Sequence, residues 1–404
     1  MATPVGDSYA TQGGTIAAGR HRLPAWVRSA MVGTWSAVPA SNTLSSLDPK
    51  NNPAINPVYP ASPEWYASGQ SRVITAWNSA AVNYAAAEMW VWGGGHADYG
   101  GNEPYKLNLL ADTPAWQMMR PPSGAIGNLL TTTGTVGESA TGLYSDGRPR
   151  VTHTYNSLVY VPGKGFTVTN LYYVYPHVNG PGKAYSFSDA TNDWSVLSDY
   201  TALGGVNSPN GGCCYDSSRN CVWLLGQGAY NMVKLDCATG AATQHGLVNN
   251  HAQGPLALKY DAANDLIYIL SSSSSGGWLD YPSRMSVFNP ATALFHVLPA
   301  PTGSLASGMS ITGHGVAWDE VGGRLLLWNE QTNRAKISVL TRPVNNLLTT
   351  AWVASELTLD AGNSVTPTAA EPNGTYGRFD YIERLGGCVL INAVNQSVYF
   401  YRVK

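Results

Sequence analysis

A hairpin signature that returns six times is the feature that most restricts how this chain can fold. In each copy a strand ends at Tyr or Trp, turns through Asp, Asn, Gly or Ser, and enters a second, apolar strand. The copies begin at positions 83, 154, 214, 259, 317 and 380 and read NYAAAEMWVWGGG, TYNSLVYVPG, CYDSSRNCVWLLG, KYDAANDLIYIL, AWDEVGGRLLLW and DYIERLGGCVLI. These starts lie about 45 to 71 residues apart, a spacing typical of β-propeller blades with variable loops.

A second signature follows most copies and supplies two more strands. It contains a third strand, a turn rich in Asp, Ala and Thr, and an aromatic residue that opens a fourth strand, as in LLADTPAWQMM, FSDATNDWSVL and FNPATALFHVL. The sixth hairpin is followed by a third strand but no fourth, while a spare strand of this kind, GTWSAVP, lies near the N-terminus. We therefore predict an all-β, six-bladed β-propeller whose last blade is closed by Thr34–Val38 pairing with Gln396–Val403. A β-sandwich or a parallel β-helix is the alternative, but neither explains this displaced strand.

The composition agrees with one propeller domain at 33–404 preceded by an N-terminal arm at 1–32, which is polar and rich in Gly and Ala. The chain has 404 residues, 43 Gly and 25 Pro, and only 12% charged residues. The net charge is −2, and charges of both signs are scattered along the chain with no basic stripe. We therefore expect no nucleic-acid partner. No apolar run is long enough to cross a bilayer, so we expect no membrane insertion. The first residues lack the basic and apolar regions of a secretion signal.

The five cysteines are predicted to be buried free thiols. Two of them, Cys213 and Cys214, are neighbours on one strand and point to opposite faces, which argues against a disulfide between them. The sequence contains no CxxC pair and no His/Cys cluster with zinc spacing. We expect no metal and no cofactor.

Binding is expected on one face of the propeller. In four-stranded blades, the loops joining strands two and three and those joining successive blades all emerge on the same side. Nearly all the variation in loop length falls there, and long loops on a rigid scaffold are where binding sites are usually built. The long loops are Ala40–Arg72, Pro121–Arg150, Asn170–Lys183, Ser271–Ser283, Pro299–Ile311 and Thr358–Gly377.

The segment WVWGGGHADYGGNEPYKLNL, residues 90–109, has the densest set of polar groups on that face. Its three glycines permit a backbone path closed to other residues. The side chains that follow form either a ligand-binding or ion-binding cluster at the mouth of the central channel, or a turn whose polar groups bond nearby backbone amides. These candidate residues are His96, Asp98, Tyr99, Asn102 and Glu103.

The same segment carries a family resemblance over about Ala76–Trp116. Its glycine run, its Tyr before the third strand and its Trp beyond it resemble a kelch repeat. The block GGGHADYGGNE is similar to one that introduces the first blade in kelch-like, galactose-oxidase-type propellers of tailed bacteriophages and prophages. The resemblance implies a virion protein, made in the host cytoplasm, and it transfers no catalytic residue.

Two enzymatic functions need residues that the sequence offers only in part. A radical copper oxidase needs Tyr and His ligands and a Cys crosslinked to one Tyr; Cys214–Tyr215 are strand neighbours whose side chains diverge. A sialidase needs an arginine cluster at the channel mouth, which Arg72, Arg150 and Arg378 would form if they converged. We favour a protein that is not an enzyme and keep Arg378 as a candidate ligand contact.

Histidines near the starts of innermost strands are further candidates. His153, His314 and His251 would hold a metal only if three of them converged with His96. Hydrogen-bonded residues lining the channel are the commoner arrangement, and we keep His153 and His314 as candidate ligand contacts.

Two functions remain open. The first is a structural or adhesive component of a tailed-phage particle, a tail, tail-tip, fibre or decoration protein, docked to other virion subunits through the N-terminal arm. The second is a carbohydrate-active enzyme or lectin acting on cell-surface glycans, with loop aromatics stacking on sugar rings or packed beneath the loops. Trp278 and Tyr281 are the preferred sugar contacts, and the other aromatics considered are Trp65, Tyr66, Tyr172 and Tyr173.

Overall fold

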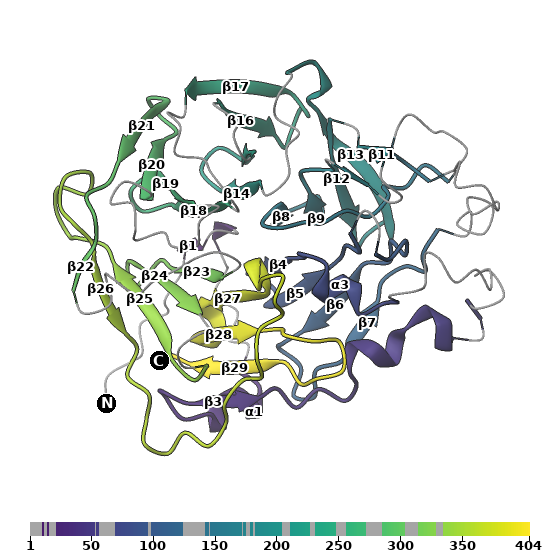
Figure 1. Cartoon of the computed structure of the whole chain (residues 1–404), viewed down its shortest axis with the longest axis horizontal. Helices are drawn as coiled ribbons and strands as arrows, with labels where there is room; N and C mark the ends of the chain where they lie inside the picture. Colours follow the sequence, from purple (N-terminus) through teal and green to yellow (C-terminus); the bar gives the residue numbers. More distant parts are fainter. Residues whose placement is uncertain are drawn as a thin grey trace.

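Six small antiparallel sheets form a ring, and each sheet is one blade of a propeller (Figure 1). The structure is a computed structural model. It describes residues 10–11, 14–15, 22–52, 54–55, 69–95, 98–123, 142–144, 146–171, 173–174, 178–180, 182–203, 211–226, 231–247, 256–271, 285–303, 314–328 and 334–404. The predicted all-β, six-bladed fold is confirmed.

In the first five blades, four strands run in chain order from the centre to the rim. The first three blades are β4 (Ala80–Asn83), β5 (Glu88–Val91), β6 (Tyr105–Asn108) and β7 (Trp116–Met118); β8 (Leu158–Val161), β9 (Gly165–Val168), β12 (Lys183–Ser188) and β13 (Asp193–Asp199); β14 (Gly212–Asp216), β15 (Cys221–Leu225), β16 (Asn231–Asp236) and β17 (Ala242–Leu247). The fourth and fifth are β18 (Leu256–Asp261), β19 (Leu266–Ser271), β20 (Met285–Asn289) and β21 (Leu294–Val297); β23 (Gly315–Asp319), β24 (Arg324–Trp328), β25 (Ile337–Thr341) and β26 (Val353–Glu356). The fifth blade has an additional short strand, β22 (Thr302–Gly303), parallel to β26.

The sixth blade joins the two ends of the propeller domain. It contains β27 (Phe379–Ile382), β28 (Gly387–Leu390), β29 (Tyr399–Arg402) and, at the rim, β3 (Trp35–Ala37). Trp35 is opposite Tyr401, and its indole Nε1 donates to the carbonyl of Ala335 at 2.8 Å. The predicted closure by the N-terminal strand is therefore confirmed, and β3 lies beside the C-terminal strands in Figure 1.

The remaining elements are short. The helices are α1 (Ala25–Ser29), α3 (Arg72–Thr75), η1 (Leu44–Leu47), η2 (Pro49–Asn51), η4 (Thr201–Leu203), η5 (Tyr376–Arg378) and η6 (Glu383–Leu385). Two small hairpins pair β1 (Ala10–Thr11) with β2 (Gly14–Thr15) and β10 (Tyr173–Val174) with β11 (Val178–Asn179). None of the helices in the described ranges has the length and apolar character that crossing a membrane requires.

An aspartate at the end of the innermost strand explains the repeated hairpin in three blades. Asp216, Asp261 and Asp319 end β14, β18 and β23, and all three are buried. In each, Oδ1 accepts a hydrogen bond from a backbone N–H two or three residues later, at 2.9, 3.2 and 2.9 Å respectively. The side chain thus satisfies amides of the tight turn that the backbone ladder leaves unpaired.

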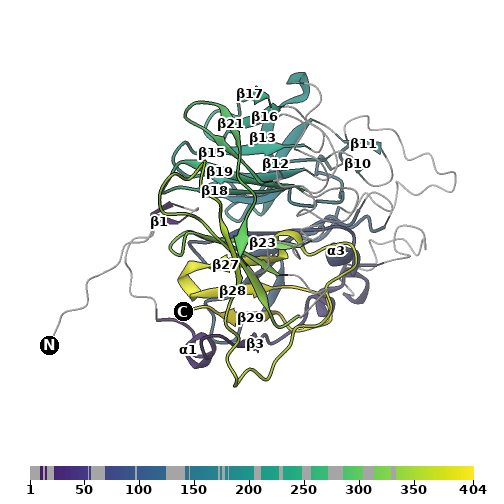
Figure 2. The same ribbon diagram turned by 60° about the vertical axis from the view of Figure 1, so that its left-hand side comes forward.

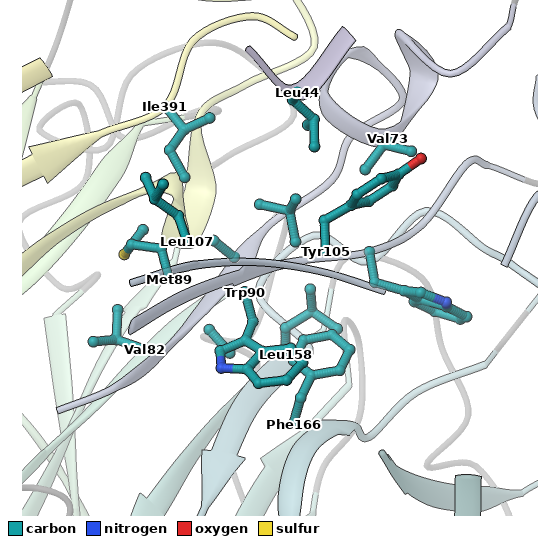
Figure 3. Close-up of a cluster of buried hydrophobic side chains, with 14 of the residues drawn as sticks. Leu44, Val73, Val82, Met89, Trp90, Tyr105, Leu107, Leu158, Phe166 and Ile391 are labelled. Atoms are coloured by element: carbon teal, nitrogen blue, oxygen red, sulfur yellow. The ribbon is translucent and has the colours of Figure 1, made fainter. Parts of the chain in front are cut away.

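The hydrophobic core fills the wedges between neighbouring blades. On the first blade, Met89 and Leu107 point toward Ile391 of the sixth blade, while Trp90 points to the opposite side (Figure 3). The Trp90 ring stacks on Phe166 of the second blade with ring centroids 5.8 Å apart and an interplanar angle of 11°. Successive strand residues therefore pack against different neighbouring blades.

Ion pairs also tie neighbouring blades together. Lys106 Nζ of the first blade lies 3.2 Å from Asp189 Oδ2 of the second. Arg342, after β25 of the fifth blade, forms an ion pair with the buried Asp261 of the fourth. The five cysteines are free and buried, as predicted.

Candidate functional site

The long connections emerge where the sequence indicated, between the second and third strands of a blade and between blades. Figure 2 shows α3, which precedes β4, on the same side of the ring as the β10–β11 hairpin, which lies between β9 and β12. The polar block of residues 92–104 connects β5 to β6 on this loop-rich face.

The glycine run of this block is dictated by close packing. Gly93 has φ of +125°, and a Cβ there would lie 2.5 Å from Asn78 Oδ1. A Cβ on Gly94 would lie 2.3 Å from the carbonyl oxygen of Tyr99. The N–H of Gly95 donates to the carbonyl of Thr152 at 3.1 Å, which fastens the run to the entry of the second blade. Only glycine fits this path.

Tyr99 and Glu103 belong to a buried hydrogen-bond network. The hydroxyls of Tyr99 and Tyr105 both donate to Glu103 Oε1, at 2.6 and 2.9 Å, and Gln70 Nε2 donates to the Tyr105 hydroxyl at 2.9 Å. Figure 3 shows Tyr105 beside Val73 and Leu44. Burial raises the pKa of Glu103 to about 7, although the tyrosine hydrogen bonds act in the opposite direction.

Asn102 joins the block to the connection between the first two blades. Its Nδ2 donates to Ser123 Oγ and to the carbonyl of Pro149, both at 3.0 Å, and its Oδ1 accepts the Ser123 N–H at 2.8 Å. Its own carbonyl accepts the indole N–H of Trp92 at 3.0 Å. The side chains of Tyr99, Asn102 and Glu103 are therefore used within the protein to hold the loops.

Among the described candidates of this block, Asp98 reaches the surface, with 21% of its side chain exposed. Its carboxylate lies 3.7 Å from Arg72 Nε and 3.9 Å from His153 Nε2. His153 Nδ1 lies 2.6 Å from the carbonyl of Ala76, and because a carbonyl only accepts, Nδ1 carries the proton. The structure thus brings two of the predicted site residues, Asp98 and His153, together at the mouth of the propeller.

Arg378 and His314 are both buried at the entries of innermost strands. Arg378 donates to the carbonyls of Asn78 at 2.9 Å and Ile391 at 2.6 Å, and also to that of Gly374. Burial lowers its pKa to about 10. Its guanidinium fixes the approach of the sixth blade to the first, and His314 immediately precedes β23 in the fifth blade.

The three arginines that would have to form a sialidase cluster take separate partners. Arg72 pairs with Asp98, and Arg150 donates to the carbonyl of Leu143 at 2.9 Å while its guanidinium lies over the Tyr144 ring. Arg378 is buried and donates to backbone carbonyls. In the ranges that the structure describes, no three His, Cys, Asp or Glu side chains lie close enough to hold a metal ion.

Several of the predicted contacts fall outside the described residues: His96, Trp278 and Tyr281, and with them Trp65, Tyr66, Tyr172 and His251. Tyr173 lies in β10, and nothing is described of its side chain. These remain predictions.

The central channel contains a cavity of ≈ 50 Å³ lined by the innermost strands of five blades. By the rule of about 10–15 Å³ per water it has room for a few water molecules. Lys259 Nζ of the fourth blade lies 3.5 Å from Asp380 Oδ2 of the sixth, and the hydroxyl of Tyr84 donates to the same oxygen at 2.7 Å. Burial and then the charge of Asp380 raise the pKa of Tyr84 well above its ordinary value.

Three aromatic residues at the mouth were not among the predicted site residues. Tyr155, which the sequence placed at the end of the first strand of the second hairpin, instead precedes the innermost strand β8, so that predicted hairpin turn was wrong. Trp77, Tyr155 and Tyr376 precede β4, β8 and β27, and the structure holds each at positive φ, 53°, 44° and 49°. A local signal for them exists: an aromatic residue three positions before an innermost strand, followed by Asn or Gly and then Ser or Arg (WNS, YNS, YGR).

Comparison with known proteins gives no family. No family model and no curated protein matches the sequence. A structural genomics protein of unknown function from Bacteroides thetaiotaomicron VPI-5482 is similar in structure, with 11% identity, a TM-score of 0.46, and coverage of 91% of this chain and 75% of that one. An auxiliary nutrient binding protein from the same organism gives 9% identity, a TM-score of 0.46, and coverage of 82% and 69%. Both similarities are too distant to inform the function of this chain.

Proposed function

We propose that this chain is a non-enzymatic structural or adhesive protein of a tailed-bacteriophage particle, in which a rigid propeller presents its loop-rich face to a host surface or a neighbouring subunit. The motivation is the resemblance of Ala76–Trp116 to kelch-like phage propellers. One structural observation supports it: Tyr99, Asn102 and Glu103 of the resembling block are buried in hydrogen bonds that hold the loop face together. Buried side chains with this role hold the loops in fixed positions, as a rigid docking surface requires.

The ring itself also suits a platform. The sixth blade is closed by β3, and ion pairs such as Lys106–Asp189 join neighbouring blades. A ring whose ends are joined within one sheet presents its loops at fixed positions, which reduces the ordering cost of binding.

Docking to the particle is assigned to the residues that precede α1. The last part of the predicted arm packs on the propeller: the Trp26 ring meets Phe400 edge-on with centroids 5.2 Å apart, and Arg402 donates to the carbonyl of Val27. The N–H of Ala25 donates to Asp112 Oδ1 at 2.7 Å. A truncation meant to test docking must therefore spare α1.

Peptide mass spectrometry of density-purified phage particles from the source, induced if it is a prophage, tests the proposal. We expect the chain at a stoichiometric copy number. Its presence in the cell lysate alone would overturn the assignment to the virion. A variant lacking residues 2–21 should remain folded yet fail to join particles, and unchanged incorporation would overturn the docking role of the arm.

The alternative function, glycan recognition, is favoured by the half-buried rings of Trp77 and Tyr155 on the loop-rich face. The site supports binding over hydrolysis. Glycoside hydrolases use a pair of carboxyl groups flanking the bond to be cut, whereas Glu103 is 1% exposed and bonded to two tyrosines while Asp98 lies near the surface. A lectin-like role is compatible with host-surface adhesion.

A further inference from the structure

Backbone strain is concentrated in aromatic residues at the channel mouth. Nine non-glycine residues in the described ranges have positive φ. Six of them are Ala, Asn or Asp residues in turns or connections within blades, where a left-handed residue is ordinary. The other three are Trp77, Tyr155 and Tyr376, bulky residues for which this region is unfavourable. Strain of this kind persists only where the surroundings impose it, and it gathers at ligand sites.

The surroundings impose it through hydrogen bonds between the three strand entries. The N–H of Tyr155 donates to the carbonyl of Trp77 at 2.7 Å. The N–H of Ser79 donates to Thr154 Oγ1 at 2.8 Å, and the N–H of Gly377 donates to Ser79 Oγ at 3.0 Å. The sixth, first and second blades are therefore locked to one another where these aromatics sit.

The rings form a continuous group with His153. Its imidazole meets Trp77 edge-on, with centroids 4.8 Å apart and an angle of 83°, and lies 6.0 Å from Tyr155. Tyr155 in turn meets Tyr376 edge-on at 5.7 Å. The neighbouring residues Ser79, Asn156 and Gly377 line the channel cavity, so this aromatic group lies at its mouth. Trp77 and Tyr155 are half-buried, whereas Tyr376 is 2% exposed and supports them from beneath.

A donor and an acceptor flank the aromatic group. Asp98 lies 3.9 Å from His153 Nε2 and 3.7 Å from Arg72 Nε, and both charged side chains are partly exposed. A carboxylate accepts hydrogen bonds and a guanidinium donates them. This pair therefore matches adjacent hydroxyl groups, each of which can donate to one member and accept from the other.

We propose that the aromatic group and the Asp98–Arg72 pair form a binding site for a pyranose ring of a surface polysaccharide. The C–H face of the sugar stacks on Trp77, whose π-electron face is negative, with Tyr155 beside it. Adjacent hydroxyls bond to Asp98 and Arg72. This inference deepens the proposed adhesive role and relies on it only for the origin of the sugar.

An aromatic group beside a carboxylate can also receive a quaternary ammonium ion. Arg72 argues against that ligand, because its guanidinium already pairs with Asp98 and would repel a second cation. Choline is therefore the discriminating probe.

The test is calorimetric titration of the full chain with methyl glycosides of glucose, galactose and N-acetylglucosamine, and with choline chloride. We expect one glycoside to bind and choline not to bind. Trp77→Gly removes the ring and suits the positive φ, and should weaken binding by about tenfold or more. Asn192→Gly is the control: it makes the same kind of change at φ 51° in the turn between β12 and β13, and should leave binding unchanged.

The titration results distinguish failure of the binding site from failure of the virion role. Binding of choline alone, binding of no glycoside, or unchanged affinity in Trp77→Gly would overturn the site. If Trp77→Gly does not fold, Asp98→Ala takes its place, and unchanged affinity there would overturn the proposal equally. Glycoside binding by a chain absent from particles would overturn the virion role and leave the site intact, whereas a stoichiometric virion protein that binds none of the glycosides would do the reverse.

Discussion

Replacing Glu103 by Gln should remove a pH dependence from the stability of this protein. Burial raises the pKa of Glu103 from its ordinary value of 4.5 to about 7. The folded state therefore holds this proton more tightly than the unfolded state does. The contribution of Glu103 is complete below about pH 4.5 and is lost as pH rises through about 7. At about 1.4 kcal/mol per pKa unit, the loss amounts to about 3 kcal/mol.

Urea denaturation at about pH 5 and about pH 8 gives the measurement. We expect wild type to lose more unfolding free energy than Glu103→Gln between the two pH values, by about 2–3 kcal/mol. Gln Oε1 can accept from both Tyr99 and Tyr105, while its amide group replaces Oε2. An unsatisfied buried amide would cost about 1–3 kcal/mol at both pH values, and this constant offset cancels in the comparison.

The prediction is tested by comparing the pH dependence of the unfolding free energy in wild type with that in Glu103→Gln. Glu320, whose pKa burial also raises to about 7, contributes to the wild-type curve with the same sign. Asp199→Asn serves as the control, because the pKa of Asp199 is lowered to about 2 by Thr201 and Lys183, far below the tested range. Equal pH dependence in wild type and Glu103→Gln would refute the assignment of a raised pKa to this carboxyl.

Three further substitutions test the fold. Asp261→Ala leaves Arg342 without its buried partner and should cost about 3–5 kcal/mol in urea denaturation; a loss below about 1 kcal/mol would contradict a structural role for this ion pair. Trp35→Ala removes a 2% exposed ring from the closing strand and should cost about 3–5 kcal/mol, with the same measurement; an unchanged midpoint would mean that β3 does not close the ring. Gly93→Ala should lower the melting temperature, because its Cβ would meet Asn78 and its φ is +125°, at a cost of about 1–3 kcal/mol; an unchanged melting temperature would show that the run tolerates other residues.

The fold was predictable because its information is local and repeated. Five of the six predicted hairpins have their turn where the sequence placed it, as after the aspartates that end β14, β18 and β23. The turn of the second hairpin instead follows Val161. The displaced strand followed from counting, since a ring of four-stranded sheets with one strand missing at one end needs a partner from the other. The structure places Trp35 opposite Tyr401, within the segments predicted to pair.

The candidate site was predictable only in part. The glycine run and the polar block were visible in the sequence, but the fate of each side chain depends on distant segments. Asn102 is bonded to Ser123 and Pro149, and Glu103 is linked through Tyr105 to Gln70. Nothing within the block distinguishes these buried residues from Asp98, which reaches the surface.

The aromatic residues at the mouth were missed for a different physical reason. A positive φ at a bulky residue is unfavourable locally, so propensity points away from it. The hydrogen bonds that impose it run between blades, as from the N–H of Tyr155 to the carbonyl of Trp77. The positive φ of these aromatic residues therefore depends on the closed ring. In the sequence, the repeated aromatic–Asn or aromatic–Gly pair is the local pattern that accompanies it.

The polar block of residues 92–104 and the aromatic group at the channel mouth therefore have separable roles on the loop-rich face: the block holds the loops, and the aromatic group is the proposed ligand contact. Asn102 and Glu103 are buried, so substituting them disturbs the loops and changes stability and recognition together. Trp77 is half-buried at a position where glycine is conformationally better suited, so its ring can be removed while the backbone path is kept. Loss of binding is evidence for a contact only when stability is retained, and Trp77 is a residue on this face whose geometry allows that separation.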